Sequence, residues 1–292
     1  MGDDVESREK KLYETFSITM ELERPILHDE VEEENKTREK NNKKILNHKN
    51  IKNVMRWILA GLVIAIVGFF IWANNSYKPQ AMAHSALISD ENVIVNKDKF
   101  ITFTPANTNP TKGFIFYPGA RVNPESYAPI CKDIAQKGYK VFIVEPTLNL
   151  AILSPNKAKD VIEENSDIST WVVGGHSLGG TIAAKFASNN RTLVDGVVLL
   201  ASYPMNDDLK SLSMDVISIW GSKDGVVNFK SLIESKEKLP SDATFVEIEG
   251  GNHAQFGDYG KQKGDNEAII NQEKQIDITS KSIIKFLDKI EQ

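Results

Sequence analysis

The sequence predicts an α/β fold in which a mainly parallel sheet carries helices on both faces, with one transmembrane helix before it. Two observations lead to this prediction. From about residue 86 onward, short apolar segments alternate with helix-like segments, and residues 57–73 form a long stretch without any charge. The chain has 292 residues, which is enough for one sizeable domain and additional segments.

The overall composition limits the classes of partner. A formal net charge of −5 argues against nucleic acid as the main partner, because phosphate binding calls for a basic face. The one cysteine, Cys131, excludes an intramolecular disulfide and a cysteine-based zinc cluster. We expect it to be a small buried side chain on a helix.

Residues 1–53 form a polar and densely charged tail. Acidic and basic residues are mixed, aromatic residues are few, and a Lys/Arg/Asn-rich run covers 36–52. Such a segment buries too little apolar surface to offset its ordering entropy, so we expect it to be disordered or loosely helical. A solvated tail is the favoured interpretation, and docking of a protein partner is the alternative.

Residues 54–73 are predicted to be a transmembrane helix. They would form a helix about 30 Å long, which matches the hydrocarbon core of a bilayer. Trp57 and Trp72 stand near its ends, where interfacial aromatic residues belong, and Arg56 can extend to the headgroups. A buried core helix is the alternative, and an apolar stretch of this length argues against it.

The flanking charges predict the orientation of this helix. Eight Lys or Arg residues lie between 36 and 56, whereas the next ones after the helix are Lys78 and Lys97. The positive-inside rule then places the tail in the cytoplasm and the later residues outside it. A signal peptide cleaved after Ala81-Met82-Ala83 is the alternative, but the long preceding tail favours an uncleaved signal anchor, with 74–85 as a linker.

The domain from 86 to 292 is predicted to contain a sheet. Residues 86–106 have the pattern of an early hairpin or meander. Six later segments are short, apolar on both faces and end in Gly, Pro or polar residues, as buried parallel strands do. They are GFIFYPG (113–119), YKVFIVEP (139–146), WVVGGHS (171–177), DGVVLLASYP (195–204), DVISIWGSKD (215–224) and TFVEIEGG (244–251). Helices are expected near 124–137, 156–165, 178–189, 228–239 and 276–290.

The residues that follow each strand are the candidates for a site, because ligands bind beyond the carboxyl ends of parallel strands. GHSLG, at 175–179, follows one strand and precedes a helix-forming segment. This G-x-S-x-G pattern in a strand–turn–helix context is typical of a nucleophile elbow around Ser177. The flanking glycines are expected because side chains there would collide with a neighbouring strand or helix. A short motif also occurs by chance, so an ordinary turn serine is the alternative.

A nucleophilic serine needs a base, and the base needs an orienting carboxylate. Of the five histidines, His253 alone is suitably placed, in a Gly-rich loop after the last strand. Asp224 follows an earlier strand, so Ser177, Asp224 and His253 stand in the chain order expected for this architecture. Asp207 and Asp208 are the reserve acids, and roles as plain loop residues remain the alternatives for His253 and Asp224.

The chain from about 86 to 292 resembles the α/β-hydrolase superfamily, in particular the compact bacterial group near the dienelactone-hydrolase-like enzymes. The motifs that carry the resemblance are YPGA, GGHSLGG, LLASYP, GSKDGV and EGGNHAQFGDYG. Dienelactone hydrolases have a cysteine nucleophile, so Ser177 points to general ester chemistry instead. The resemblance also implies an oxyanion hole formed by the backbone N–H groups of Ala120 and Leu178.

The sequence gives weaker evidence for the residues that line the substrate pocket. Arg121, Asn149 and Met205 are candidates to line it, with a solvated arginine and ordinary loop packing as the alternatives. Only the 14 residues 202–215 separate two consecutive strands, which leaves no room for a sizeable helical lid. We therefore expect an open, small pocket.

Together these patterns predict a membrane-anchored, extracytoplasmic serine hydrolase. It would cleave small acyl esters through an acyl-enzyme, with no metal and no organic cofactor. A thioesterase, amidase or acyltransferase on the same triad is the alternative within enzymes. A noncatalytic membrane protein that binds a ligand is the alternative from another class.

Overall fold

The computed structural model describes residues 32–38, 40, 48–207 and 209–290. The chain divides into two compact units, Met1–Val67 and Gly68–Gln292. Residues 32–38 are helical, while most of the tail predicted to be disordered or loosely helical lies outside the described residues. The predicted domain boundaries at 53, 73 and 85 stay predictions.

Helix α3, His48–Asn74, contains the predicted membrane span. Within Ile51–Ala73, the most apolar stretch of 18 residues has a mean hydropathy of 2.4, and none of that stretch is buried. A helix of this length and composition fits a single transmembrane helix. It is the one such helix among the residues that the structure describes.

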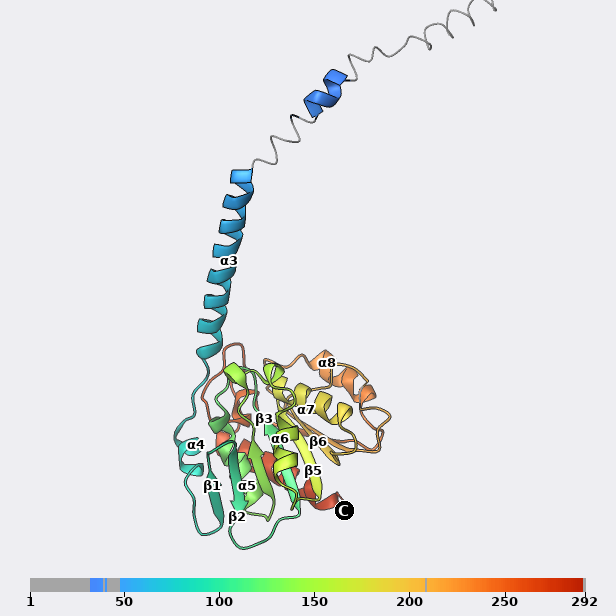
Figure 1. The fold of residues 1–292 in the computed structure, drawn as a ribbon. Helices are drawn as coiled ribbons and strands as arrows, with labels where there is room; N and C mark the ends of the chain where they lie inside the picture. The colour runs from blue at the N-terminus through green and yellow to red at the C-terminus, as the bar shows by residue number, and fades with distance from the viewer. Residues whose placement is uncertain (1–31, 39, 41–47, 208, 291–292) are drawn as a thin grey trace, which may run out of the picture. The chain divides into compact units, whose positions relative to one another are not determined.

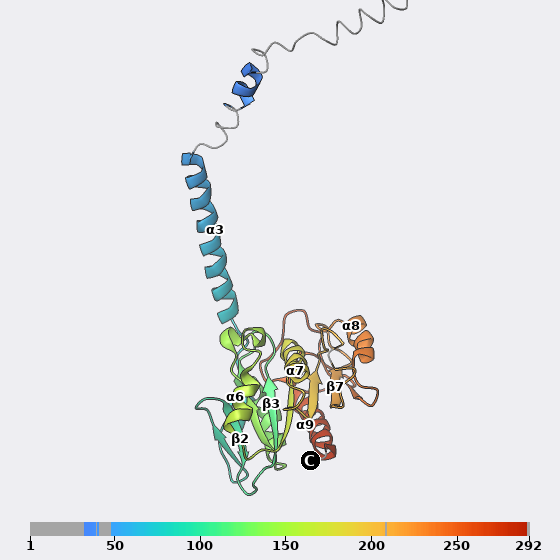
Figure 2. The same cartoon turned by 45° about the vertical axis from the view of Figure 1, so that its right-hand side comes forward.

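One sheet of eight strands forms the domain (Figures 1 and 2), in the order β1-β2-β4-β3-β5-β6-β7-β8. The hairpin of β1 and β2 is antiparallel, and the strands from β4 to β8 along this order are parallel. The strands are β1 (Val93–Asn96), β2 (Ile101–Pro105), β3 (Lys112–Tyr117), β4 (Lys140–Ile143), β5 (Thr170–His176), β6 (Gly196–Leu200), β7 (Asp215–Gly221) and β8 (Thr244–Ile248). The predicted hairpin and all six later strands are confirmed.

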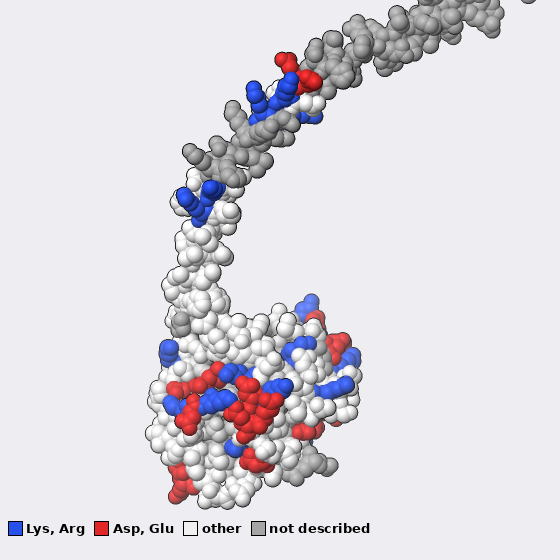
Figure 3. Space-filling view, viewed as in Figure 1, with Lys and Arg blue, Asp and Glu red and all other residues white. Residues whose placement is uncertain are grey.

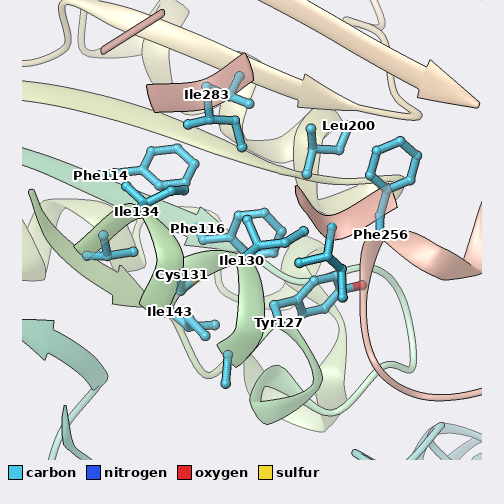
Figure 4. Packing of buried hydrophobic residues seen from close by; sticks show 14 of the residues in the cluster. Phe114, Phe116, Tyr127, Ile130, Cys131, Ile134, Ile143, Leu200, Phe256 and Ile283 are labelled. Atoms are coloured by element: carbon cyan, nitrogen blue, oxygen red, sulfur yellow. The ribbon is translucent and has the colours of Figure 1, made fainter. Parts of the chain in front are cut away.

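Helices cover both faces of the sheet, as predicted. Along β3, Phe114 and Phe116 pack with α5 and α9 on one face, while Ile115 and Tyr117 pack with α6 and α7 on the other. Figure 4 shows the first of these two cores. This alternation follows from the period of two along a strand. The helices are α5 (Ala128–Ala135), α6 (Lys157–Glu164), α7 (Leu178–Asn189), α8 (Phe229–Glu234) and α9 (Gln272–Lys289). Cys131 is buried on α5, as expected.

Two sequence expectations need correction. Strand β8 lies at the edge of the sheet and is largely exposed, so it is not apolar on both faces. The linker 74–85 is also more structured than its name suggests. Its Tyr77 forms a parallel bridge with Val122, and it continues into α4, Ala81–Ala86. Ala83 is buried and donates its backbone N–H to the Asp258 carboxylate at 2.8 Å.

Two phenylalanines on this sheet give a matched test of the core. Phe116 is fully buried and its ring lies 4.7 Å from the ring of Tyr127, whereas Phe245 on β8 is 38% exposed. Phe116→Ala should lower the free energy of unfolding by about 3–5 kcal/mol, because it leaves a cavity. Phe245→Ala should cost about 1 kcal/mol, since the site is half solvated. Urea unfolding of the full chain in detergent, followed by near-ultraviolet circular dichroism, measures both, and equal losses would contradict the assignment of the core.

Candidate active site

Ser177 occupies a sharp turn between β5 and α7. Its backbone has φ 52° and ψ −124°, a conformation that costs energy in any residue with a side chain. The turn is held on both sides, since Ser177 donates its N–H to the Leu200 carbonyl at 2.9 Å. Its own carbonyl accepts the Ser202 hydroxyl at 2.7 Å. The strained conformation is therefore stabilised by the end of β6.

The glycines on either side of Ser177 are required by close packing against β3. A Cβ atom on Gly175 would lie 2.5 Å from the Tyr117 carbonyl oxygen, and one on Gly179 would lie 2.2 Å from the same atom. These approaches are too close for any side chain. The absence of side chains lets the start of α7 pack against the end of β3, which leads into the turn carrying Ala120.

His253 and Asp224 form a buried pair. His253 Nδ1 lies 2.7 Å from Asp224 Oδ2, and both side chains are almost completely buried. The other carboxylate oxygen accepts the backbone N–H groups of Val226 and Val227. With Nδ1 fixed in this way, the opposite nitrogen, Nε2, is the one left for chemistry. Nε2 is buried and has no hydrogen-bond partner among the described residues.

Ser177 and His253 both line one cavity of about 400 Å³. The remaining lining residues are Leu178, Thr181, Ala201, Ser202, Tyr203, Met205, Val226, Val227 and Asn228. A hydroxyl on a strained turn and a histidine with an unpartnered nitrogen thus face the same mostly apolar space. Such an arrangement can carry out nucleophilic attack with proton transfer.

Asp265 is a member of this site that the sequence did not reveal. Its carboxylate accepts backbone N–H groups from Gly225 at 2.9 Å, Ala254 at 2.8 Å and His253 at 3.3 Å. Gly225 follows Asp224, and Ala254 follows His253. Asp265 therefore fastens the loop of the acid to the loop of the histidine. Its position in a Gly-rich loop carries no sequence signal for this role, which depends on two other loops meeting there.

The backbone N–H groups of Ala120 and Leu178 are placed as potential donors. Both residues are half-buried, and neither donates its N–H to another group within the described parts of the chain. Leu178 is the first residue of α7, where the N–H groups have no partner inside the helix. Ala120 lies in the turn after β3, although it does not line the cavity itself.

Tyr127 and His176 connect the turn of Ala120 to the histidine loop. The Tyr127 hydroxyl accepts the N–H of Gly119 at 3.0 Å and lies 2.8 Å from His176 Nδ1. The His176 ring in turn packs against the His253 ring, with centroids 4.4 Å apart. Burial holds the pKa of His176 well below its ordinary value of 6.5. Burial also raises the pKa of Tyr127, so its hydroxyl keeps its proton beside the neutral His176 ring.

The three predicted pocket residues have different positions. Met205 lines the cavity and is 70% exposed at its mouth. Arg121 and Asn149 do not line it, which corrects the expectation for both. Arg121 donates from Nη2 to the Asn75 carbonyl at 2.5 Å, and the Asn149 carbonyl accepts the Arg121 N–H at 2.8 Å. Among the reserve acids, Asp207 is exposed, and Asp208 lies outside the described residues.

Backbone strain gathers at this edge of the sheet. Five residues other than glycine have positive φ angles within the described ranges. They are Arg121, Leu148, Asn149, Ser177 and Ala201. Each lies in a connection after the carboxyl end of a parallel strand from β3 to β6. Such strain is concentrated at functional sites, where the surrounding structure holds it in place.

Comparison with known proteins identifies the family. Residues 113–277, more than half of the chain, match the model of the alpha/beta hydrolase family. The chain belongs to this family. It is therefore a hydrolase by family, with the α/β-hydrolase fold that the strand order shows. A search of curated proteins found no match.

Solved structures share the fold of this α/β-hydrolase. Est1E from Butyrivibrio proteoclasticus, with ferulic acid bound, is 11% identical with a TM-score of 0.53, covering 70% of this chain and 98% of Est1E. The esterase domain of a Rhodothermus marinus protein is 13% identical with a TM-score of 0.52, covering 64% and 90%. A predicted CIB-like hydrolase from Thermoplasma acidophilum is 15% identical with a TM-score of 0.50, covering 66% and 99%. At these identities the likeness shows the fold alone.

The buried His176 predicts a pH dependence of stability. Its pKa is well below 6.5 in the folded chain, so between these two values the unfolded chain binds a proton that the folded chain does not. Its contribution to stability is therefore present above pH 6.5 and declines as the pH falls below it. The difference in unfolding free energy between the wild type and His176→Phe should increase from pH 5 to pH 7 and then level off. His84→Phe, at an exposed histidine, is the matched control in urea unfolding. A constant difference for His176→Phe would refute the prediction.

Proposed function

We propose that this α/β-hydrolase is a membrane-anchored serine hydrolase that cleaves small acyl esters, with Ser177, His253 and Asp224 as its triad. One observation carries the proposal. The buried Asp224–His253 hydrogen bond leaves Nε2 of His253 without a partner in the cavity that Ser177 lines. A histidine oriented by a carboxylate beside a serine on a strained turn has the composition of a hydrolytic triad.

The chemistry follows from these positions. The Ser177 hydroxyl oxygen attacks the acyl carbon while His253 Nε2 takes its proton. Asp224 holds the ring through Nδ1 and stabilises the positive charge that forms on it. The N–H groups of Ala120 and Leu178 donate to the oxygen that becomes negative. His253 then protonates the leaving alcohol, and water attacks the acyl-enzyme by the reverse steps to release the acid.

Two further observations favour an ester of modest size. The described residues between β6 and β7 contain no helix, so the cavity opens without a helical lid. Two structures of the same fold are named for esterases, and one of them holds ferulic acid. For this chain, small acyl esters remain our proposal, with thioester or amide cleavage and acyl transfer as alternatives on the same triad.

We also propose that α3 is an uncleaved anchor and that the hydrolase domain lies outside the cytoplasm. The charges before the span support this orientation. The packing of the linker supports retention of the anchor. Cleavage after Ala83 would divide α4 and remove Tyr77, which bridges to Val122. A signal peptide would not need to contribute such contacts to the mature fold.

The role of Ser177 can be tested with a fluorophosphonate probe. Wild type should be labelled and Ser177→Ala should not, because the probe phosphonylates an activated serine hydroxyl. Ser188→Ala, on α7 but outside the cavity, should be labelled like the wild type. Asp224→Asn should lower kcat for p-nitrophenyl butyrate by about 10³–10⁴, because the histidine loses its orienting charge. Equal labelling of wild type and Ser177→Ala would refute the proposed triad.

The orientation can be tested by cysteine labelling in intact cells. Cys131 is buried, and burial raises the pKa of its thiol, so the natural chain should give little background. Asn107→Cys, in the exposed turn after β2, should react with a membrane-impermeant maleimide. Ser7→Cys in the tail should react only after the cells are opened. The reverse pattern would place the domain in the cytoplasm.

A further inference from the structure

The residues after the membrane span lead directly to the turn that carries Ala120. Tyr77 stands four residues after Ala73, where the span ends. It donates its N–H to Arg121 at 2.7 Å, and its carbonyl accepts the N–H of Asn123 at 3.0 Å. Four residues of extended chain reach at most about 14 Å. The turn therefore lies within that distance of the end of the span, whatever the direction of the helix.

Arg121 adds two contacts between this turn and the residues at the end of the span. All its partners here belong to the unit Gly68–Gln292. Its Nη2 donates to the Asn75 carbonyl, and its guanidinium lies 4.6 Å from the centre of the Trp72 ring. Ser76, the residue between Asn75 and Tyr77 in the chain, is buried. Tryptophan at the end of a span lies at the level of the lipid headgroups. The residue next to Ala120 is thus bonded to the part of the chain that meets the membrane surface.

Exposed apolar side chains surround the same edge of the domain. We call them the apolar rim, and they are Ile152, Leu153, Met205, Val226, Phe229 and Ile233, each 36–70% exposed. All follow the carboxyl ends of β4, β6 or β7, the end of the sheet at which Ser177 and Ala120 lie. In Figure 3 the middle of the upper edge of the domain is uncharged, whereas acidic and basic side chains stand at its right end and lower on that face. Apolar groups exposed at one edge indicate contact with something apolar.

We propose that the apolar rim rests on the bilayer and that the site acts on acyl esters of membrane amphiphiles. This inference rests on the proposed function. The short connection between the span and the turn of Ala120 brings this edge of the domain close to the bilayer. Exposed aliphatic and aromatic side chains enter the boundary between headgroups and acyl chains. The ester of an amphiphile lies at that depth. Its acyl group passes to Ser177, its alcohol leaves with the proton from His253, and water then releases the carboxylic acid.

The full chain in phosphatidylcholine vesicles tests the proposal with two substrates. One is a fluorogenic amphiphile that is held in the bilayer and carries a short acyl ester, and the other is water-soluble p-nitrophenyl butyrate. Twelve Gly/Ser residues inserted between Asn74 and Asn75 extend the connection by roughly 20 Å and keep the Tyr77 and Asn75 contacts. Turnover of the bilayer ester should fall about tenfold or more, as expected when the effective concentration of a tethered site drops. Turnover of the soluble ester should not change. The same insertion between Asn41 and Asn42, before the span, is the control.

Substitutions in the apolar rim provide a second test that leaves the connection intact. Ile152→Ser with Ile233→Ser should lower turnover of the bilayer ester about fivefold or more, because less apolar surface enters the membrane. The matched control is Ile88→Ser with Ile94→Ser, also exposed but away from this edge. If the insertion and the rim variants leave the bilayer ester unaffected, or lower both substrates equally, the inference is overturned. An unmodified chain that hydrolyses only the soluble ester overturns this inference alone. An unmodified chain that hydrolyses neither ester and is not labelled by the fluorophosphonate probe overturns the proposed function as well.

Discussion

The hydrogen bond between Asp224 and His253 is the interaction on which the candidate site depends. A carboxylate and a histidine buried this deeply would each destabilise the fold without a partner. Their pairing offsets that cost, and it also decides which histidine nitrogen remains available. The pair exists because β7 and β8 run parallel, so the loops at their carboxyl ends meet at one edge. Asp265 then fastens these two loops through backbone N–H groups rather than side chains.

A second set of contacts joins the histidine to the rest of the site. The strained turn of Ser177 is backed by β6, and its glycines allow α7 to approach β3. Tyr127 and His176 connect the turn of Ala120 to the histidine loop. The Tyr127 hydroxyl contacts both the Gly119 N–H and the His176 ring, and the His176 ring packs on the His253 ring. Because these groups are buried and His176 is neutral, the link adds no charge near His253. The orientation of His253 therefore depends on a neutral neighbour as well as on its acid.

Local patterns in the sequence were sufficient for the strands, for most helices and for the pairing of Asp224 with His253. Buried parallel strands are continuous apolar runs, and chain order with few histidines limited the candidates. Roles that depend on contacts between distant loops could not be predicted, as Asp265 and Tyr127 show. Arg121 was a candidate for the pocket because it directly follows Ala120, whereas its side chain donates to Asn75 in the linker. The catalytic role of Ser177 stays a prediction until it is tested chemically.

The turn after β3 joins the linker to the candidate site through four consecutive residues. Gly119 is held by Tyr127, Ala120 offers its N–H, Arg121 binds the linker, and Val122 bridges to Tyr77. These are four consecutive residues, so the contacts of the linker and the Ala120 amide share one short turn. Stabilisation of a negative oxygen depends on donors that are already in place. The backbone hydrogen bonds of Tyr77 and Gln80 to the domain therefore constrain the linker and the candidate oxyanion donor Ala120 together.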